Sequence, residues 1–224
     1  MRKFSNYSIL TYILFIVLSV SSCTSTNSPV LLSGTVTDVE GNVYHTVSIG
    51  TQTWMAENLK TTKYKDSTLI PDVTNNSEWY TLAKGAYCNG NNPRTYGKLY
   101  NWYAVSSGKL APAGWHVATD ADWTKLSSCL GGEGLAGGKL KESGTAHWIT
   151  PNLSATNDSL FSALPGGDRD STYHSAGISG YWWSATEYNS AQAWFRVMNH
   201  ESTGLGRFPT GNKVFGFSVR CVKD

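Results

Sequence analysis

The sequence predicts one α+β domain, in which two helices flank a small, mostly antiparallel sheet with long ordered loops. Alternating apolar residues predict a hairpin and a third short strand over residues 34–56, and a second strand pattern runs directly into a capped helix over 114–130. A last alternating strand over 216–222 closes the domain. The 224 residues are enough for one sizeable core, and nothing in the composition indicates a second domain.

The clearest element is the strand that leads into a helix. Trp115 and Val117 alternate with polar or smaller residues, so both can face a core. Thr119 is a good N-cap, and Asp122 three residues later approximates a capping box. The helix then presents one apolar stripe, formed by Trp123, Leu126 and Leu130.

A first amphipathic helix is expected over residues 97–105. The helical spacing that predicts it comes from the side chains of Tyr96, Leu99, Tyr100 and Tyr103. The rest of the chain predicts irregular structure over 60–92, a helical turn or strand over 135–142, long loops over 144–179, and strands over 181–184 and 193–198. A loop segment of this length is usually functional.

The N-terminus has the pattern of a secretion signal. Arg2 and Lys3 precede an apolar run over residues 9–20 that is too short for a membrane span. The following Val-Ser-Ser-Cys at 20–23 resembles the bacterial lipoprotein box, in which the cysteine thiol is acylated and becomes the new N-terminus. An ordinary signal peptide with an incidental cysteine is the alternative.

We therefore expect a lipoprotein signal peptide over residues 1–22, lipidation at Cys23 and a polar tether over 23–33. More than one acyl chain would attach the protein firmly to the cell envelope. Thr24 is not acidic, which by analogy with Gram-negative lipoproteins favours the outer membrane. The membrane is then one partner of the mature protein.

The charge pattern argues against nucleic-acid binding. Without Arg2 and Lys3, the chain carries 16 basic and 16 acidic residues, and the basic residues are scattered singly rather than gathered in a stripe.

Beyond Cys23, three cysteines remain, so at most one internal disulfide can form. No C-x-x-C motif suggests a thiolate metal site.

Several short motifs occur in a fixed order along the chain, at residues 52–59, 85–88, 96–102, 114–123, 164–167 and 216–222. Together they resemble the Fibrobacter succinogenes major paralogous domain, and we assign residues 34–224 to this domain. That family is found largely on secreted or lipid-anchored proteins, and its biochemical role is not established. A more distant similarity to the formylglycine-generating-enzyme family implies a C-type-lectin-like fold, with adjacent N- and C-terminal strands.

The resemblance also bears on the cysteines. Cys88 and Cys221 both lie in motifs that match the family, whereas Cys129 lies at the exit of a predicted helix. We therefore expect a disulfide between Cys88 and Cys221, with Cys129 unpaired.

No catalytic constellation is recognisable in the sequence. The five histidines, at 45, 116, 147, 174 and 200, have no metal-ligand spacing. The stretches 157–158 and 168–170 offer oxygen ligands of the kind calcium takes, but both are weak signals. The cysteines also lack the catalytic context of the formylglycine-generating family. We expect no enzymatic activity, no cofactor and no metal.

The aromatic content suggests binding instead. Among nine tryptophans, five are expected in the core, namely Trp54, Trp102, Trp115, Trp123 and Trp183, while exposed rings could stack on sugars. We place the recognition surface in the segment 144–212, with Tyr188, His200 and Arg207 as first candidates. The predicted function is a lipid-anchored binding or adhesion module for a glycan or a surface protein. The alternative is a structural or assembly subunit of an envelope complex.

The anchor assignment predicts the behaviour of a Cys23→Ala variant. Without the thiol that receives the lipid, the protein should be released or misprocessed, as cell fractionation and immunoblotting would show. An unchanged amount in the membrane fraction would contradict lipidation at Cys23.

Overall fold

The first and last strands of the domain meet in a five-stranded sheet. The computed structural model describes residues 32–224, and the predicted signal peptide and lipidation site lie outside this range. The sheet has the order β1-β2-β3-β12-β6, and its neighbouring strands pair antiparallel. Its strands are β1 (Leu32–Thr37), β2 (Val43–Ile49), β3 (Gln52–Met55), β6 (Trp115–Val117) and β12 (Cys221–Lys223).

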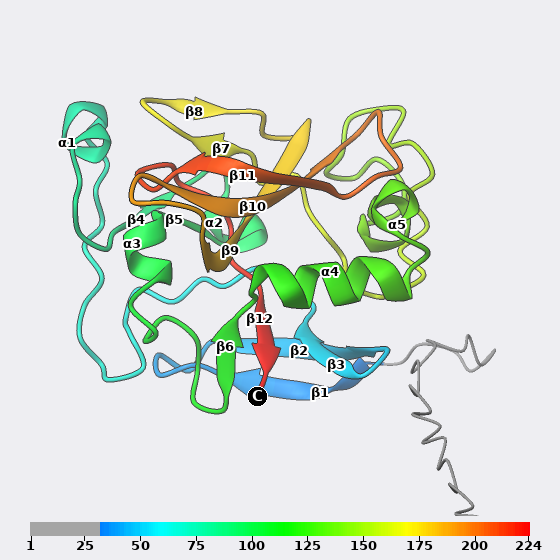
Figure 1. The fold of residues 1–224 in the computed structure, drawn as a ribbon, viewed down its shortest axis with the longest axis horizontal. Helices are drawn as coiled ribbons and strands as arrows, with labels where there is room; N and C mark the ends of the chain where they lie inside the picture. Colours follow the sequence, from blue (N-terminus) through cyan, green and yellow to red (C-terminus); the bar gives the residue numbers. More distant parts are fainter. Residues whose placement is uncertain (1–31) are drawn as a thin grey trace, which may run out of the picture.

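A second, three-stranded sheet lies on the other side of helix α4 (Asp120–Cys129), as Figure 1 shows. It is formed by β9 (Ser179–Glu187), β10 (Gln192–Asn199) and β11 (Gly206–Asn212), in the order β11-β10-β9. Two short antiparallel ladders complete the strands: β4 (Tyr87–Asn89) with β5 (Lys98–Tyr100), and β7 (Asp168–Arg169) with β8 (Tyr173–His174). The predicted α+β class with mostly antiparallel sheets is confirmed.

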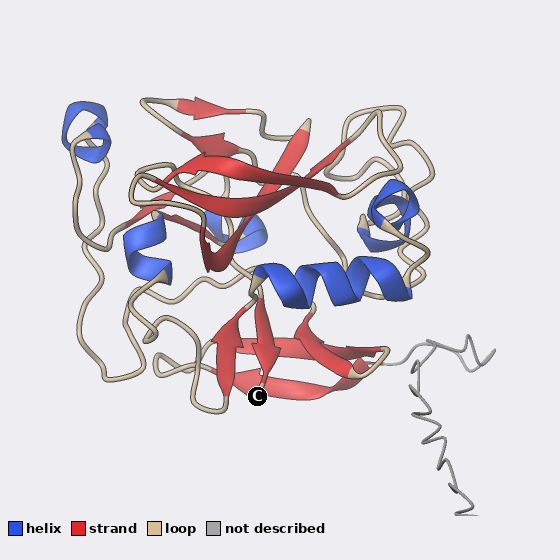
Figure 2. Ribbon diagram, viewed as in Figure 1, coloured by secondary structure: helices blue, strands red, loops and turns tan. Residues whose placement is uncertain are grey.

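Five helices occur among residues 32–224, separated by long loops (Figure 2). They are α1 (Asn76–Tyr80), α2 (Pro93–Tyr96), α3 (Trp102–Val105), α4, and α5 (Glu133–Leu140). Helix α4 has the predicted capping box: the Thr119 hydroxyl accepts from the Asp122 backbone N–H, and the Asp122 carboxylate accepts from the Thr119 N–H. Within the described part of the chain, no helix has the length and apolar character needed to cross a membrane.

The predicted continuous helix over residues 97–105 is wrong. Gly97 has φ +80°, and a Cβ there would lie 2.8 Å from the Leu59 carbonyl oxygen, so the backbone leaves helical geometry at this point. The next three residues form β5, and α3 begins only after Asn101, whose side chain accepts from the Ala104 N–H at 3.1 Å. A tertiary contact therefore overrides the helical spacing.

The last strand is shorter than predicted. Only 221–223 form β12, whereas residues 216–220 are buried and make single bridges, including Tyr100 with Phe217 and Trp182 with Ser218. The segment 135–142, left open between helix and strand, falls mainly in helix α5. Strand β1 begins at Leu32, two residues before the expected domain start.

Tryptophans form the centre of the core. All five that were assigned to the core are buried, and so are Trp148 and Trp182 from the irregular region. The ring of Trp123 on α4 lies 4.9 Å from that of Trp54 on β3 and 6.4 Å from that of Trp182 on β9. Aromatic packing through α4 thus joins the two sheets.

Buried cations hold the loops that surround this core. Arg220 is 1 % exposed and has no carboxylate partner: it donates to Asn58 Oδ1 at 2.7 Å and to the carbonyl oxygens of Met55, Phe161 and Ser162 at 2.8, 2.9 and 3.2 Å. Burial lowers the pKa of Arg220 to about 9, so the group stays protonated at neutral pH. Lys141 binds three further carbonyl oxygens, those of Leu153, Asn199 and Ser202.

The predicted disulfide between Cys88 and Cys221 is wrong. Both thiols are free and buried, and they lie in different packing clusters and in different sheets, on β4 and β12. Burial raises the pKa of both thiols. Nor is Cys129 left without a partner, contrary to expectation.

Replacing Arg220 should cost more than replacing an exposed arginine. Arg220→Met keeps the volume but leaves buried carbonyl oxygens without donors, and we expect a loss of about 3–5 kcal/mol, which corresponds to a melting temperature lower by roughly 10 °C. Thermal unfolding followed by circular dichroism measures this. The matched control, Arg94→Met at an exposed site, should change little, and an equally small effect at Arg220 would contradict the role of its hydrogen bonds.

His116 makes stability depend on pH. Its ring lies 2.7 Å from Asp224 and 3.1 Å from Asp122; burial opposes its charging, but these hydrogen bonds raise the pKa of His116 above its usual value. A raised pKa means that this stabilisation is fully present below the unfolded-state pKa, about 6.5, and disappears as pH rises through the folded-state value. The melting temperature of wild type minus that of His116→Gln should therefore be larger at pH 5.5 than at pH 8.5. An equal difference would contradict the pairing.

Candidate functional site

The structure brings two of the three predicted binding residues together, around Trp194. The Tyr188 ring meets the Trp194 ring edge-on at 5.8 Å, and the Arg207 guanidinium lies 4.1 Å from the centre of the Trp194 ring. Arg207 also donates to both oxygens of Asp120 on α4, at 2.7–3.2 Å. Two of the three guanidinium nitrogens of Arg207, Nε and Nη2, thus donate to Asp120 within the protein.

His200 lies apart from this patch. Its ring Nδ1 lies 3.1 Å from the Thr150 carbonyl oxygen, and its backbone N–H donates to Ile178 at 3.0 Å. These contacts fasten the end of β10 to the loop over 144–165. The three residues therefore do not form one site.

A cavity of about 420 Å³, lined by both polar and apolar surface, is the better candidate. We call it the Asp168 cavity; it lies between the loop after β4 and the β7–β8 hairpin, and it is lined by Asn89, Gly90, Asn91, Gly166, Asp168, Tyr173, His174, Ser175 and Ala176. Its volume falls within the range of small-molecule sites, about 300–1,000 Å³. Most of the lining lies in the segment 144–212 where the sequence placed recognition.

Gly167 allows the hairpin to close over the cavity. It has φ +70°, and a Cβ there would lie 2.2 Å from the His174 carbonyl oxygen. Its N–H donates to Ser179, and the Gly177 N–H donates to Pro165, which fixes both ends of the excursion. Two family-like motifs, 85–88 and 164–167, therefore lead into the two walls of the cavity.

Strand alternation sends Arg169 to the opposite side from its two acidic neighbours. Its guanidinium is fully buried between the rings of Trp79 and Tyr173, 4.5 and 4.9 Å from their centres. It donates to the Val73 and Thr74 carbonyls and to Asn76 Oδ1, at 2.5–2.9 Å. The Tyr173 ring is thus fixed from beneath while the residue stays 41 % exposed.

Asp168 is held in an unfavourable environment for a carboxylate. Burial raises its pKa, and the charge of Asp170 raises it further, whereas a hydrogen bond from Ser175 and the nearby His174 lower it. Its Oδ1 is buried with no hydrogen-bond partner, the one carboxylate oxygen of this kind among residues 32–224. Such an acceptor costs about 1–3 kcal/mol and favours any molecule that brings a donor.

The chemistry of the cavity is that of hydrogen bonding and stacking. Asp170 is bonded to His174 at 3.0 Å and closes the hairpin turn through the Thr172 N–H. Within the stretch 168–170, which the sequence offers as a source of calcium ligands, the Asp170 carboxylate therefore stabilises the turn and the Arg169 side chain is buried. Over residues 32–224 no three His, Cys, Asp or Glu side chains gather in a metal-binding arrangement.

Sequence reasoning missed the contribution of residues 89–91. This stretch looks like an ordinary Asn-Gly turn, and only the fold brings it beside the β7–β8 hairpin. The alternation Asp168-Arg169-Asp170 directly after two glycines was the available signal, because it predicts that both acids share one face.

Comparison with known proteins identifies the family but no individual relative. The family model described as the Fibrobacter succinogenes major domain matches residues 47–223. Comparisons with curated proteins and with solved structures both return no match. The chain therefore belongs to the Fibrobacter succinogenes major domain family.

Proposed function

We propose that this protein is a non-enzymatic binding module, anchored to the cell envelope through Cys23, that captures its ligand in the Asp168 cavity. The observation that carries the proposal is that Asp168, whose Oδ1 is buried without a hydrogen-bond partner, lines an open cavity. A carboxylate there lowers the stability of the free protein, so its presence is more readily explained by binding than by folding.

Ligand access to this oxygen requires only a small movement. Rotation of a carboxylate about χ2 is a soft motion, because the torsion joins sp³ and sp² atoms. A partial rotation turns the unpartnered oxygen of Asp168 from the protein side towards the cavity, whereas a half-turn would only exchange two equivalent oxygens. A hydrogen-bond donor on the ligand can then pair with one oxygen while Ser175 pairs with the other.

We further propose a C-type-lectin-like arrangement for the domain. The adjacency of the N- and C-terminal strands supports it, since β12 pairs with β3 of the first hairpin region. The two longest helices and the long excursion between core strands agree with it as well. In such a scaffold, loops bind while the framework stays fixed.

The alternative is a structural or assembly subunit of an envelope complex. The exposed Tyr188 and the half-buried Trp194, with Arg207 stacked on Trp194, favour this alternative because aromatic and arginine side chains often dominate protein interfaces. Alanine substitution at Tyr188 would then disturb assembly, and substitution at Asp168 would not.

Asp168→Asn separates binding from folding. Removing the charge from a poorly solvated site should leave the melting temperature unchanged or raise it, while capture of ligands on glycan and protein arrays should be lost. The matched control is Asp158→Asn, at an exposed loop position, which should change neither. Full retention of capture by Asp168→Asn, or a large loss of stability, would contradict the proposal.

A further inference from the structure

We propose that the ligand of the Asp168 cavity is a neutral saccharide, with one sugar ring stacked on Tyr173 and its hydroxyls hydrogen-bonded to Asp168. This inference rests on the proposed function and names the ligand class for the same cavity. It follows from three features of the lining: a fixed aromatic ring, a carboxylate and amides beside it, and the lack of lysine and arginine.

The Tyr173 ring is a preorganised platform. Its inner face packs on the Arg169 guanidinium, which Trp79 holds from the other side. Its hydroxyl interacts with the Cys88 thiol, and burial raises the pKa of Tyr173 to about 12, so the phenol stays neutral. A ring that is fixed before binding loses little conformational entropy on stacking, which favours an apolar face of a sugar over a flexible chain.

The lining has polar groups next to this ring that can bind hydroxyls. Asp168 has an oxygen without a donor, and the Asn91 amide is exposed. Asn89, by contrast, already donates to Asp72 and accepts from Lys98. A ligand that carries several hydroxyl donors close to an apolar ring face fits this combination of groups.

The charges facing the cavity disfavour acidic sugars. Asp168 lines the cavity, whereas Arg169 is fully buried and donates to residues 73–76, and the lining contains no lysine or arginine. The Lys98 ammonium is bound to Asn89 and lies 5.2 Å from the Tyr87 ring centre. A uronate or sialate would thus meet the Asp168 carboxylate, and the one histidine of the lining, His174, is already bonded to Asp170.

The experiment is a binding titration of the purified full chain with two sets of immobilised oligosaccharides. One set ends in neutral residues, glucose, galactose, mannose or N-acetylglucosamine, and the other ends in glucuronate or sialate. We expect binding to at least one neutral probe and at least about tenfold weaker binding to the acidic probes. Tyr173→Leu should weaken neutral binding about tenfold, and Tyr173→Phe should retain it, because the ring rather than the hydroxyl makes the contact.

Matched controls separate the site from the fold. Tyr188→Ala removes another exposed tyrosine and should leave saccharide binding unchanged, as should Asp158→Asn. Melting temperatures identify any variant that has lost its fold. Tyr173→Phe keeps the ring over Arg169, so it tests the role of the ring even if Tyr173→Leu unfolds. Asp168→Asn should weaken neutral binding about tenfold or more.

The outcomes distinguish this inference from the proposed function. Equal or tighter binding of acidic probes, or neutral binding that ignores Tyr173→Leu, overturns the inference. Capture of a protein but of no saccharide, lost in Asp168→Asn, overturns the inference and leaves the proposed binding module intact. No capture that depends on Asp168 overturns both.

Discussion

Buried cations that bind backbone carbonyl oxygens hold this domain together. A chain with long loops has many peptide groups outside any ladder, and each buried carbonyl needs a donor. Three side chains supply those donors. Arg220 donates to residues 161 and 162, and Arg169 donates to residues 73 and 74. Lys141 donates to the separate carbonyl oxygens of residues 153, 199 and 202. None of the three forms a salt bridge within residues 32–224; carbonyl oxygens and the faces of aromatic rings balance their charges instead.

This constraint connects the fold to the candidate site. The Arg169 guanidinium that fixes the α1 region is the same group that supports the Tyr173 ring at the cavity. A change in the loop over 73–76 would therefore alter the position of Tyr173 through Arg169, without any direct contact between the loop and Tyr173.

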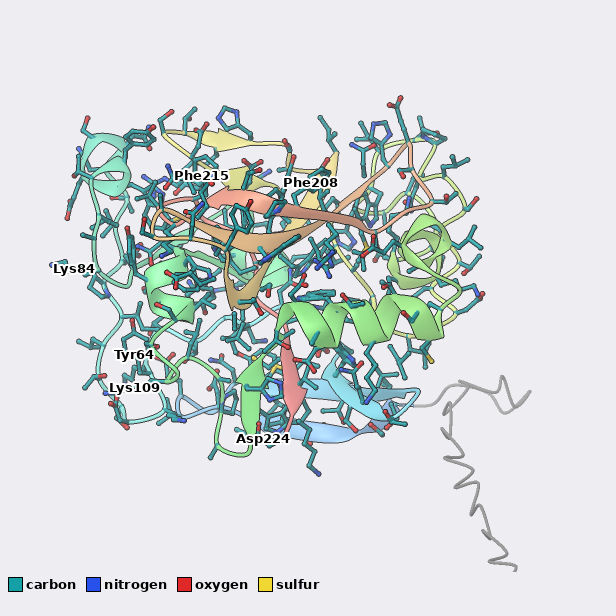
Figure 3. All side chains as sticks on the ribbon, in the orientation of Figure 1. Tyr64, Lys84, Lys109, Phe208, Phe215 and Asp224 are labelled. Atoms are coloured by element: carbon teal, nitrogen blue, oxygen red, sulfur yellow. The ribbon has the colours of Figure 1, made fainter. Side chains whose placement is uncertain are left out.

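The two sheets lie on opposite sides of the molecule. In Figure 3, Phe208 and Phe215 lie near the three-stranded sheet in the upper half of the view, and Asp224 lies with the five-stranded sheet below.

Elements specified by neighbouring residues could be predicted, and elements specified by distant ones could not. Thr119 and Asp122 cap α4 through groups three residues apart, so the sequence is enough. Gly97 breaks the expected helix because Leu59 lies against it, and the Asp168 cavity forms where 89–91 meets 166–176. The sequence indicates Arg207 as a ligand-binding residue, yet its guanidinium donates to Asp120, which lies 87 positions away in the chain.

Among the buried, unpartnered side-chain atoms of residues 32–224, the candidate site holds the carboxylate oxygen. Around Arg220 and Lys141, buried donors find protein acceptors, whereas at Asp168 a buried acceptor oxygen lacks a donor. The β7–β8 hairpin that carries Asp168 lies on the far side of the three-stranded sheet from β1, through which the chain enters the domain (Figure 1). If Cys23 anchors the chain, the hairpin with the unmet acceptor lies on the opposite side of the domain from the strand that follows the tether, where a ligand outside the membrane would approach.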